Sequence, residues 1–448
     1  MQDLDGGSTM TAPSDLAALS PPVQAGSVPG QSPPPDASAA YNARWTRVMD
    51  CVNLRRPDRM PVGLFSTFWF AKYGGISNRT MMYDYARIAQ IIEQLCLDLQ
   101  PDMYTPISMT ATFGLPMEAT GYRQLQWPGH GVDDHRPFQY IDREYMSAEE
   151  YDDFLFDPTG FYLGKYLPRV CEIYSGLEPV ASVTGSFYVG TCFSAAAFAD
   201  PSIAIAVGKL SKAAGVMLNH FAEGAALAQR MRSLGFPSMY GAVAIAPYDV
   251  VADYFRGATG MMKDLFRHPA KILQVLDKMA TFVIRGTLAM ASQTDNPIVF
   301  IPIHWAPDAF MSQKQFEKFW WPSFERFMTA LINAGLVPMP MWESDCTKRL
   351  PFLREHTPPG KCIYWFERTD MVKAFDVLGD IVALRGGMPG SLMINGTPAS
   401  IDAEVRRLVE NVYDKGGRLI LEGAFGLPDE APIENVRAMC EAARKYAG

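Results

Sequence analysis

The sequence lacks the features that define several classes of protein. Its seven cysteines are scattered along the chain, and no two of them form a Cys-x-x-Cys pair. An odd number of scattered cysteines argues against a disulfide framework and favours reduced thiols, so we expect a cytoplasmic protein. No run of about 18 or more apolar residues occurs, and we therefore expect no segment that crosses a bilayer.

Positive charge is also scarce. Lys and Arg total 40 against 48 Asp and Glu, which gives a formal net charge of −8. An acidic chain without a basic stripe is a poor candidate for binding nucleic acid or an anionic membrane surface. The sequence also lacks a dinucleotide-binding glycine fingerprint, a phosphate loop, a His-Glu-x-x-His zinc motif and a Gly-x-Ser-x-Gly nucleophile motif.

Residues 1–40 have the composition of a disordered tail. They are rich in Pro, Gly, Ser and Ala, and they contain neither a basic start nor the apolar core of a signal peptide. We predict a disordered N-terminal tail over 1–40, followed by one folded domain over 41–448.

A series of short apolar runs follows the tail, and most of these runs precede a helical pattern. Several, such as IVFIPI at 298–303, are almost continuously apolar, as expected for parallel strands that are covered on both faces. Eight strands that alternate with helices predict an α/β fold, a closed (β/α)8 TIM barrel. The predicted strands are 61–66, 102–107, 239–246, 297–304, 337–343, 361–366, 381–386 and 418–422.

One connection is too long to be a simple loop. About 130 residues, 108–238, separate the second and third predicted strands, and a loop of that length needs structure of its own. The stretch contains an aromatic and acidic segment, 127–157, and an Ala-rich helical segment, 194–232. It is either a packed helical excursion or a lid and partner-docking face over the active site.

Four segments carry a resemblance to a known family. NARWTRVMDCVNLRRPDRMPVGLF, from residue 42, resembles the opening of uroporphyrinogen-decarboxylase-like proteins, and PYDVVADYFRGATGMMKDLFRHPAKILQVLDKM, from residue 247, resembles their helix after strand three. DAFMSQKQFEKFWWPSFERFMTAL and INGTPASIDAEV are similar to two further helix signatures of that superfamily. The chain from residue 42 onward thus resembles the uroporphyrinogen decarboxylase superfamily, most closely its corrinoid-dependent methyltransferase-like branch. The resemblance implies a barrel whose active site lies at the carboxyl ends of the strands.

That superfamily includes decarboxylation of uroporphyrinogen, corrinoid-dependent methyl transfer and zinc-dependent thiol alkylation. Where the decarboxylases carry an Arg-Gln-Ala-Gly-Arg segment that holds substrate carboxylates, this chain reads STFWFAKYGG, without arginine. Where the thiol-alkylating enzymes carry His-x-Cys and a late Cys, it reads MWESDC and EGAFG. Uroporphyrinogen is therefore not the expected substrate, and a thiol is not the expected acceptor. A zinc site built from His and carboxylates stays open.

Polar residues at the ends of the predicted strands are the candidate site, because barrel enzymes build their active sites at that face. His304 ends the fourth strand, Glu343 the fifth and Glu422 the eighth. We predict that these three residues are catalytic and that His304 and Glu343 are also the candidate ligands of a Zn²⁺ ion. The alternative for His304 is a structural histidine that lies under the excursion.

Five further residues are candidates for substrate binding. Ser66, Trp69 and Tyr104 lie near the first two strands, where aromatic side chains suit a flat apolar substrate or a large cofactor, although such residues are more often core. Glu367 ends the sixth strand beside an arginine, and it either binds a polar substrate or forms an ion pair at the rim. Arg385, near the end of the seventh strand, is a candidate to hold a carboxylate.

Taken with the resemblance, these residues predict a corrinoid-dependent methyltransferase (demethylase) that moves a methyl group between a small methylated substrate and a corrinoid or folate-type carrier. The chain has no recognisable corrinoid-carrier segment, so the cobalamin-type cofactor is expected on a separate carrier protein that docks on the excursion. One alternative is a decarboxylase or other lyase acting on a small carboxylic acid, with a cationic pocket around Arg385. Another is a non-catalytic barrel that binds a corrinoid or a partner protein. A homodimer is compatible with all three.

Overall fold

The structure, a computed structural model, describes residues 36–107, 110–181 and 188–447. Most of the predicted tail, residues 1–35, lies outside the described residues, and so do two short parts of the predicted excursion. Helix α1 (Ala37–Val52) includes the last residues of the predicted tail, so ordered structure begins a few residues earlier than the composition indicated. All described residues belong to one unit of the chain, Pro33–Gly448.

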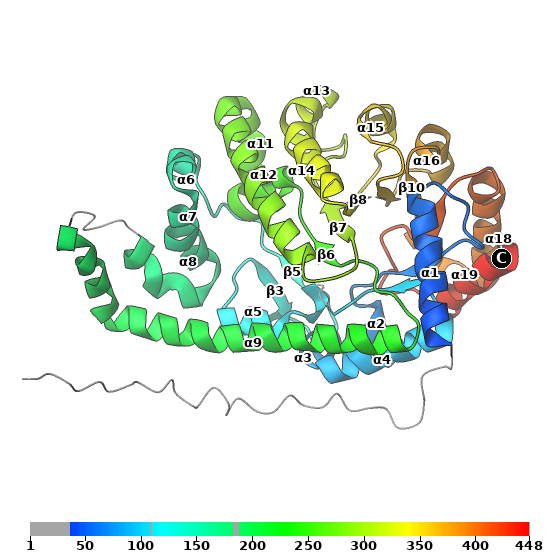
Figure 1. Cartoon of the computed structure of the whole chain (residues 1–448), viewed down its shortest axis with the longest axis horizontal. Coiled ribbons are helices and arrows are strands. Elements are labelled where there is room, and N and C mark those ends of the chain that lie inside the picture. The colour runs from blue at the N-terminus through cyan, green and yellow to red at the C-terminus, as the bar shows by residue number, and fades with distance from the viewer. Residues whose placement is uncertain (1–35, 108–109, 182–187, 448) are drawn as a thin grey trace, which may run out of the picture. The chain divides into compact units, whose positions relative to one another are not determined.

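A sheet of six parallel strands forms the framework, in the order β11-β10-β9-β8-β7-β6 (Figure 1). Two further strands, β1 and β2, pair with each other in parallel. All eight lie within or across the ends of the predicted apolar runs, which confirms an α/β fold with a parallel sheet. The strands are β1 (Gly63–Leu64), β2 (Met103–Tyr104), β6 (Ala242–Val243), β7 (Ile298–Ile303), β8 (Val337–Trp342), β9 (Ile363–Phe366), β10 (Ala383–Met388) and β11 (Leu419–Gly423).

Single parallel bridges connect the β1–β2 pair to both sides of the six-stranded sheet. Val62, just before β1, bridges to Leu421 of β11, and Tyr104 of β2 bridges to Ser238, which precedes β6. Backbone hydrogen bonds support both connections: Leu421 N–H donates to the Pro61 carbonyl over 2.8 Å, and the amide that follows Ser238 donates to the Tyr104 carbonyl over 2.9 Å. The pair therefore lies between β11 and the chain segment that leads into β6.

Helices follow most of the strands, and their starts match the sequence signals. The Ser312 side chain accepts a hydrogen bond from the Gln315 amide and forms a capping box at the start of the helical segment that leads into α14. Thr397 caps α18, with Pro398 at the first helical position. The longer helices outside the excursion are α4 (Tyr85–Leu99), α11 (Gly257–Arg267), α12 (Pro269–Ala291), α14 (Trp321–Asn333), α18 (Pro398–Leu408) and α19 (Ile433–Tyr446).

Large side chains from the strands and from α1 fill one of the two buried clusters. Phe65 packs against Phe300 and Trp365, with ring centroids 5.3 and 5.1 Å apart. Met339 and Met341 are buried in the same cluster, where their flexible side chains fill gaps between the larger ones. Because this space is packed with side chains, a ligand of ordinary size has access only to the ends of the strands.

The excursion is mainly helical, but it also contains a small sheet that the sequence did not predict. Strands β3 (Leu125–Pro128), β4 (Gly131–Val132) and β5 (Gln139–Tyr140) pair in the order β4-β3-β5. Gly129 and Gly131 adopt positive φ angles of 87° and 85°, so this segment turns sharply instead of continuing as a helix.

The most prominent helix of the excursion is α9 (Pro201–Ser233), which runs along the lower side of Figure 1. By length and composition it is the one described helix that could cross a membrane, and 17% of its most apolar stretch is buried. The expectation of no spanning segment rested on unbroken apolar runs, which Lys209 and Lys212 interrupt in this helix.

Candidate active site

Two predicted catalytic residues meet at the carboxyl ends of neighbouring strands. His304 follows β7 directly, and Glu343 follows β8 directly. His304 Nε2 lies 3.5 Å from Glu343 Oε1, and the two side chains are 32% and 24% exposed. The parallel pairing of β7 with β8 brings their ends to the same edge, so the prediction that these residues share one site agrees with the geometry.

Two aspartates complete this cluster, and sequence reasoning missed both. Asp249 ends α10 (Pro247–Asp249), and Asp253 lies in the π-helical segment η7 (Val250–Arg256) that follows it. His304 Nδ1 is 2.5 Å from Asp253, and the His304 backbone N–H donates to Asp249 over 2.6 Å. The signal was present as two acids four residues apart just after the third strand, a spacing that places them on one helix face.

Tryptophan N–H groups fix the two aspartates in place. The Trp305 indole donates to Asp253 over 2.6 Å, and the Trp320 indole donates to Asp249 over 2.7 Å. Each carboxylate is therefore held by an indole on one side and by His304 on the other. Rigid partners of this kind orient the imidazole ring and leave its Nε2 as the nitrogen that faces Glu343.

The electrostatics of the cluster favour a protonated imidazole. Burial lowers the pKa of His304, but the hydrogen bond with Asp253 and the charges of Glu343 and Asp249 outweigh it and raise this pKa to about 10. Burial raises the pKa of Glu343 and of Asp249 to about 7 in each case. The site thus combines an imidazole whose charged form is favoured with two acids whose neutral forms are favoured, a combination typical of proton-transfer sites.

Glu367 supports this cluster from the next strand. Its carboxylate accepts a hydrogen bond from the Ser344 N–H over 2.5 Å and lies 3.3 Å from Arg368 Nε. Ser344 has a φ of 62°, an uncommon conformation for a residue with a side chain. Glu367 therefore holds the strained peptide that immediately follows Glu343, in addition to forming the rim ion pair that was the alternative in its prediction.

The structure places Arg385 and Glu422 away from this cluster, inside the protein. Both side chains are 0% exposed, and they form an ion pair of 2.8 Å with each other. Arg385 also lies 4.2 Å from the Trp365 ring and contacts the sulfurs of Met239 and Met339. The predicted strand end was too early, since β10 continues to Met388 and Arg385 consequently faces the interior. We do not include this pair in the proposed site.

The predicted substrate-binding residues near β1 and β2 are also buried. Ser66, Trp69 and Tyr104 are at most 1% exposed. The Ser66 hydroxyl accepts a hydrogen bond from the Phe70 amide, and the Trp69 indole donates to the Ala431 carbonyl. The burial of all three residues, and these hydrogen bonds of Ser66 and Trp69, indicate a structural role, in keeping with the alternative that aromatic residues here are core.

Other aromatic residues lie beside the carboxylates instead. The rings of Tyr140, from β5 of the excursion, and Tyr254, which follows Asp253, are 6.2 Å apart and nearly perpendicular. Burial and the nearby charge of Asp253 raise the pKa of both phenols. The excursion therefore extends to the ends of the strands, as the lid alternative requires.

The donor set does not fit a zinc ion. Among the described residues, no group of three or more His, Cys, Asp or Glu side chains is arranged to hold a metal. Asp253 occupies His304 Nδ1, which leaves His304 Nε2 and Glu343 as two potential ligands. Protein zinc sites use three or four side chains, so we derive no catalytic step through zinc.

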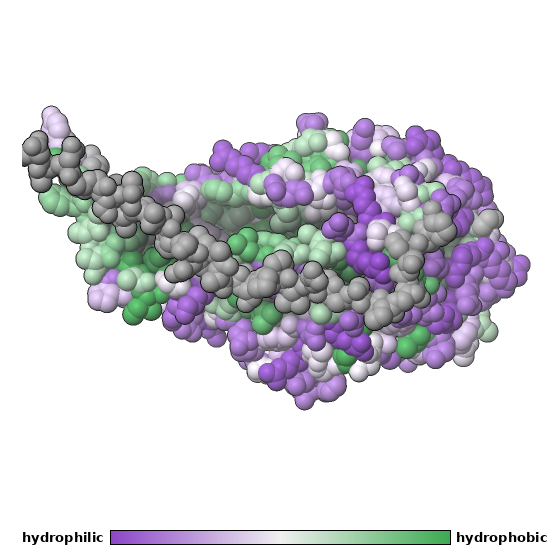
Figure 2. Space-filling view, turned by 60° about the horizontal axis from the view of Figure 1, so that its bottom comes forward, coloured by the Kyte–Doolittle hydropathy of each residue, from purple (hydrophilic) through white to green (hydrophobic). Residues whose placement is uncertain are grey.

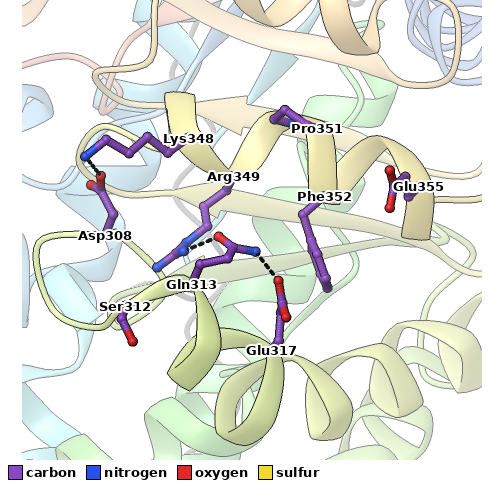
Figure 3. Close-up of a pocket in the computed structure, with 9 residues that line it drawn as sticks. All are labelled: Asp308, Ser312, Gln313, Glu317, Lys348, Arg349, Pro351, Phe352 and Glu355. Atoms are coloured by element: carbon purple, nitrogen blue, oxygen red, sulfur yellow. Dashed lines mark hydrogen bonds and ion pairs between the residues drawn. The ribbon is translucent and has the colours of Figure 1, made fainter.

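Two cavities are lined by residues that follow the strands in the chain, and neither is lined by His304 or Glu343. One, of about 740 Å³, lies at the ends of β9, β10 and β11 and is bordered by Glu367, Arg368 and Phe425. The other, of about 520 Å³, lies beyond His304 and Glu343 along the chain, where Lys348 pairs with Asp308 and Gln313 bridges an arginine and a glutamate (Figure 3). The larger cavity shares Glu367 with the cluster and has the size of a small-molecule site.

Comparison with known proteins gives two findings. Residues 204–446 match the family model described as uroporphyrinogen decarboxylase (URO-D). A methyltransferase from Methanosarcina mazei is a similar solved structure, with a TM-score of 0.60 and 14% sequence identity; the match covers 90% of this chain and 98% of the methyltransferase. None of the curated proteins matches the sequence significantly. At this level of identity, the structural likeness concerns the fold.

Proposed function

The chain belongs to the uroporphyrinogen decarboxylase family, whose model matches more than half of it, and we propose that it acts as a methyltransferase. In this proposal the bridges beside β1 and β2 close the eight parallel strands into a (β/α)8 barrel. The observation that carries the proposal is the line Asp253–His304–Glu343, which places an imidazole between two carboxylates at the carboxyl ends of the strands.

The proposed reaction removes a methyl group from the oxygen of a small donor. As the carbon–oxygen bond breaks, its electron pair stays on oxygen, and an alkoxide or phenoxide leaves poorly unless it receives a proton. His304 Nε2 supplies that proton, while Asp253 holds the ring in place. Glu343, with a pKa of about 7, exchanges protons with water and returns one to Nε2. A corrinoid on a separate carrier protein would supply the nucleophile that accepts the methyl group.

The larger cavity meets the catalytic cluster through Glu367, whose carboxylate accepts a hydrogen bond from the peptide after Glu343; His304 and Glu343 themselves do not line that cavity. The cavity of about 740 Å³ would hold the donor, with Glu367 at its border to the catalytic cluster. His304 and Glu343 are partly exposed, so an acceptor presented from outside would have access to the same place. Arg368 and Phe425 would orient the donor in place of the buried residues that the sequence suggested.

The two alternative functions have less support. A decarboxylase acting on a small acid requires a cationic pocket, and the arginine expected to form it, Arg385, is fully buried and paired with Glu422. A non-catalytic barrel has no need of a histidine whose pKa is raised to about 10 beside a glutamate whose pKa is raised to about 7.

The test mixes the purified protein with a Co(I) corrinoid and a panel of methyl donors and follows the cobalt–methyl absorption band. We expect the band with at least one methyl ether, and we expect His304→Gln to slow its formation by about 100-fold. His356→Gln is the matched control, because His356 is exposed and its contacts are with Phe352 and Trp321, outside the cluster of His304 and Glu343. Equal rates for the two variants would show that His304 is not the proton donor.

A further inference from the structure

Helix α9 has two apolar seams, and its own chain covers one of them. The covered seam contacts α5 (Gly114–Thr120), α4, α1 and the 3-10 segment η5 (Glu172–Ala181). Its buried residues are Ile203, Ala206, Ala213, His220, Leu227 and Met231. This seam is what attaches the helix to the rest of the protein.

The second seam lies on an exposed face of the same helix. Its eight positions follow one another at alternating spacings of three and four residues, which is the pattern with which one helix packs along another. Leu218 and Phe221, at its middle, are 68% and 59% exposed. Figure 2, which brings the lower side of Figure 1 forward, shows hydrophobic residues gathered over that face. The exposed seam consists of Ala204, Val207, Ser211, Ala214, Leu218, Phe221, Ala225 and Ala228.

Packing among the described residues does not require the two glycines that lie beside the exposed seam. A Cβ atom added at Gly208 or at Gly215 would meet no atom of the described residues within 4 Å. Glycine in the middle of a helix destabilises it relative to alanine. Small residues at a helix surface allow the backbone of a second helix to approach closely, and these two glycines, with Ala222 one heptad further along, provide such a surface.

We propose that a second copy of this chain packs on the exposed seam, with the two α9 helices antiparallel about a twofold axis at the level of Val216. The series of spacings reads the same in both directions, so a reversed copy places seam on seam over its whole length. A twofold interface requires a surface that is complementary to itself, and this seam meets that requirement.

The sizes of the opposed residues support the antiparallel arrangement. Reversal about Val216 places each of the three large residues of the seam opposite a small one, so that each side chain enters the space that its opposite leaves free. A parallel pair would instead place Phe221 against Phe221 and Leu218 against Leu218. The opposed pairs are Ala204 with Ala228, Val207 with Ala225, Ser211 with Phe221, and Ala214 with Leu218.

A lipid surface is the main competing occupant, since α9 has the length and hydropathy of a spanning helix. A membrane, however, accepts any apolar face and requires neither the exposed glycines nor the alternation of large and small residues. Both features have a purpose only against another helix surface.

The test measures the mass of the full-length chain by sedimentation over a range of concentrations. We expect twice the chain mass of 49.6 kDa for the wild type. The double variant Leu218→Glu/Phe221→Glu changes exposed side chains, so it is expected to fold normally and to raise the dimer dissociation constant by at least about 100-fold. Phe266→Glu, at a residue of α11 that is 77% exposed, is the matched control and is expected to leave the mass unchanged.

Cross-linking tests the arrangement of the two helices. In a Cys192→Ser background, which removes the exposed native thiol, a mixture of Ala214→Cys and Leu218→Cys chains is expected to form a disulfide more readily than either variant alone. A monomeric wild type at every concentration, or a dimer that survives the double glutamate variant, would overturn the proposal. Flotation of a monomeric wild type with phosphatidylcholine–phosphatidylglycerol vesicles would overturn it in favour of a membrane surface.

Discussion

Two clusters of charged side chains lie near the carboxyl ends of the strands, and they differ in depth. Arg385 and Glu422 form a pair that is 0% exposed and surrounded by methionine and tryptophan. The cluster of Asp253, His304 and Glu343 is partly exposed and contains more acid than base. The first pair neutralises itself inside the protein, whereas the second keeps a proton donor where a solute has access to it.

The comparison shows that a charged residue inside a strand forms a structural ion pair, whereas a charged residue just after a strand contributes to the candidate active site. Arg385 lies within β10, which continues for three residues beyond it, while His304 is the first residue after β7. A buried pair that loses one partner leaves an uncompensated charge, so substitutions in this pair should lower the free energy of unfolding. Changes in the exposed cluster should appear mainly in the rate of reaction.

The largest effect is expected from breaking the buried pair. Arg385→Met leaves Glu422 without its partner, and we expect the free energy of unfolding to fall by about 3–5 kcal/mol, measured by urea denaturation. The double variant Arg385→Met/Glu422→Leu removes both charges and is expected to recover most of that loss. If Arg385→Met is as stable as the wild type, the loss of the arginine does not leave Glu422 as a costly unpaired charge.

The converse result is expected at His304. His304→Gln should lower the rate of methyl transfer by about 100-fold. Its effect on the free energy of unfolding should be smaller than that of Arg385→Met, because the imidazole is 32% exposed and water screens its interactions. Activity and urea denaturation measured on the same preparation decide the question, and a stability loss as large as that of Arg385→Met would remove the distinction between the two clusters.

The pH dependence sharpens the comparison further. The pKa of His304 is about 10, against an ordinary value of 6.5, so its stabilisation is complete below about 6.5 and is lost as the pH rises toward 10. Activity should fall over the upper part of this range as the proton leaves. Asp253→Asn removes the neighbouring charge and should move this alkaline limb to lower pH and reduce the maximal rate by about 10-fold. A pH–rate profile with an unchanged limb would contradict the role of Asp253.

The smallest effect is expected at Ser344, beside Glu343. Glycine adopts a φ of 62° without steric cost, so Ser344→Gly should stabilise the protein by about 0.5 kcal/mol in urea denaturation. Ser312→Gly, which replaces a helix-capping serine, is the matched control and should destabilise by a few tenths of a kcal/mol. A loss of stability at Ser344 would show that the strained peptide is held by contacts of the serine side chain.

Prediction from the sequence succeeded where a residue ends a strongly apolar run. The runs before His304 and Glu343 are long and nearly unbroken, so their ends were easy to locate. Asp249 and Asp253 were missed because they belong to the segment after β6, a strand of two residues that leaves a weak signal. Their contribution depends on the way in which η7 folds back toward His304, and local sequence does not encode that contact.

The sequence by itself determined the order of strands and helices, since apolar periodicity and capping residues act over a few neighbouring positions. The tertiary structure decided which charged residues remain accessible, because burial depends on elements that are far apart in the chain. It also decided that one seam of α9 is covered and the other exposed, although the residues of each share one face of the helix by their spacing. Spacing along a helix specifies which residues share a face, and only the packing of the other elements specifies what that face meets.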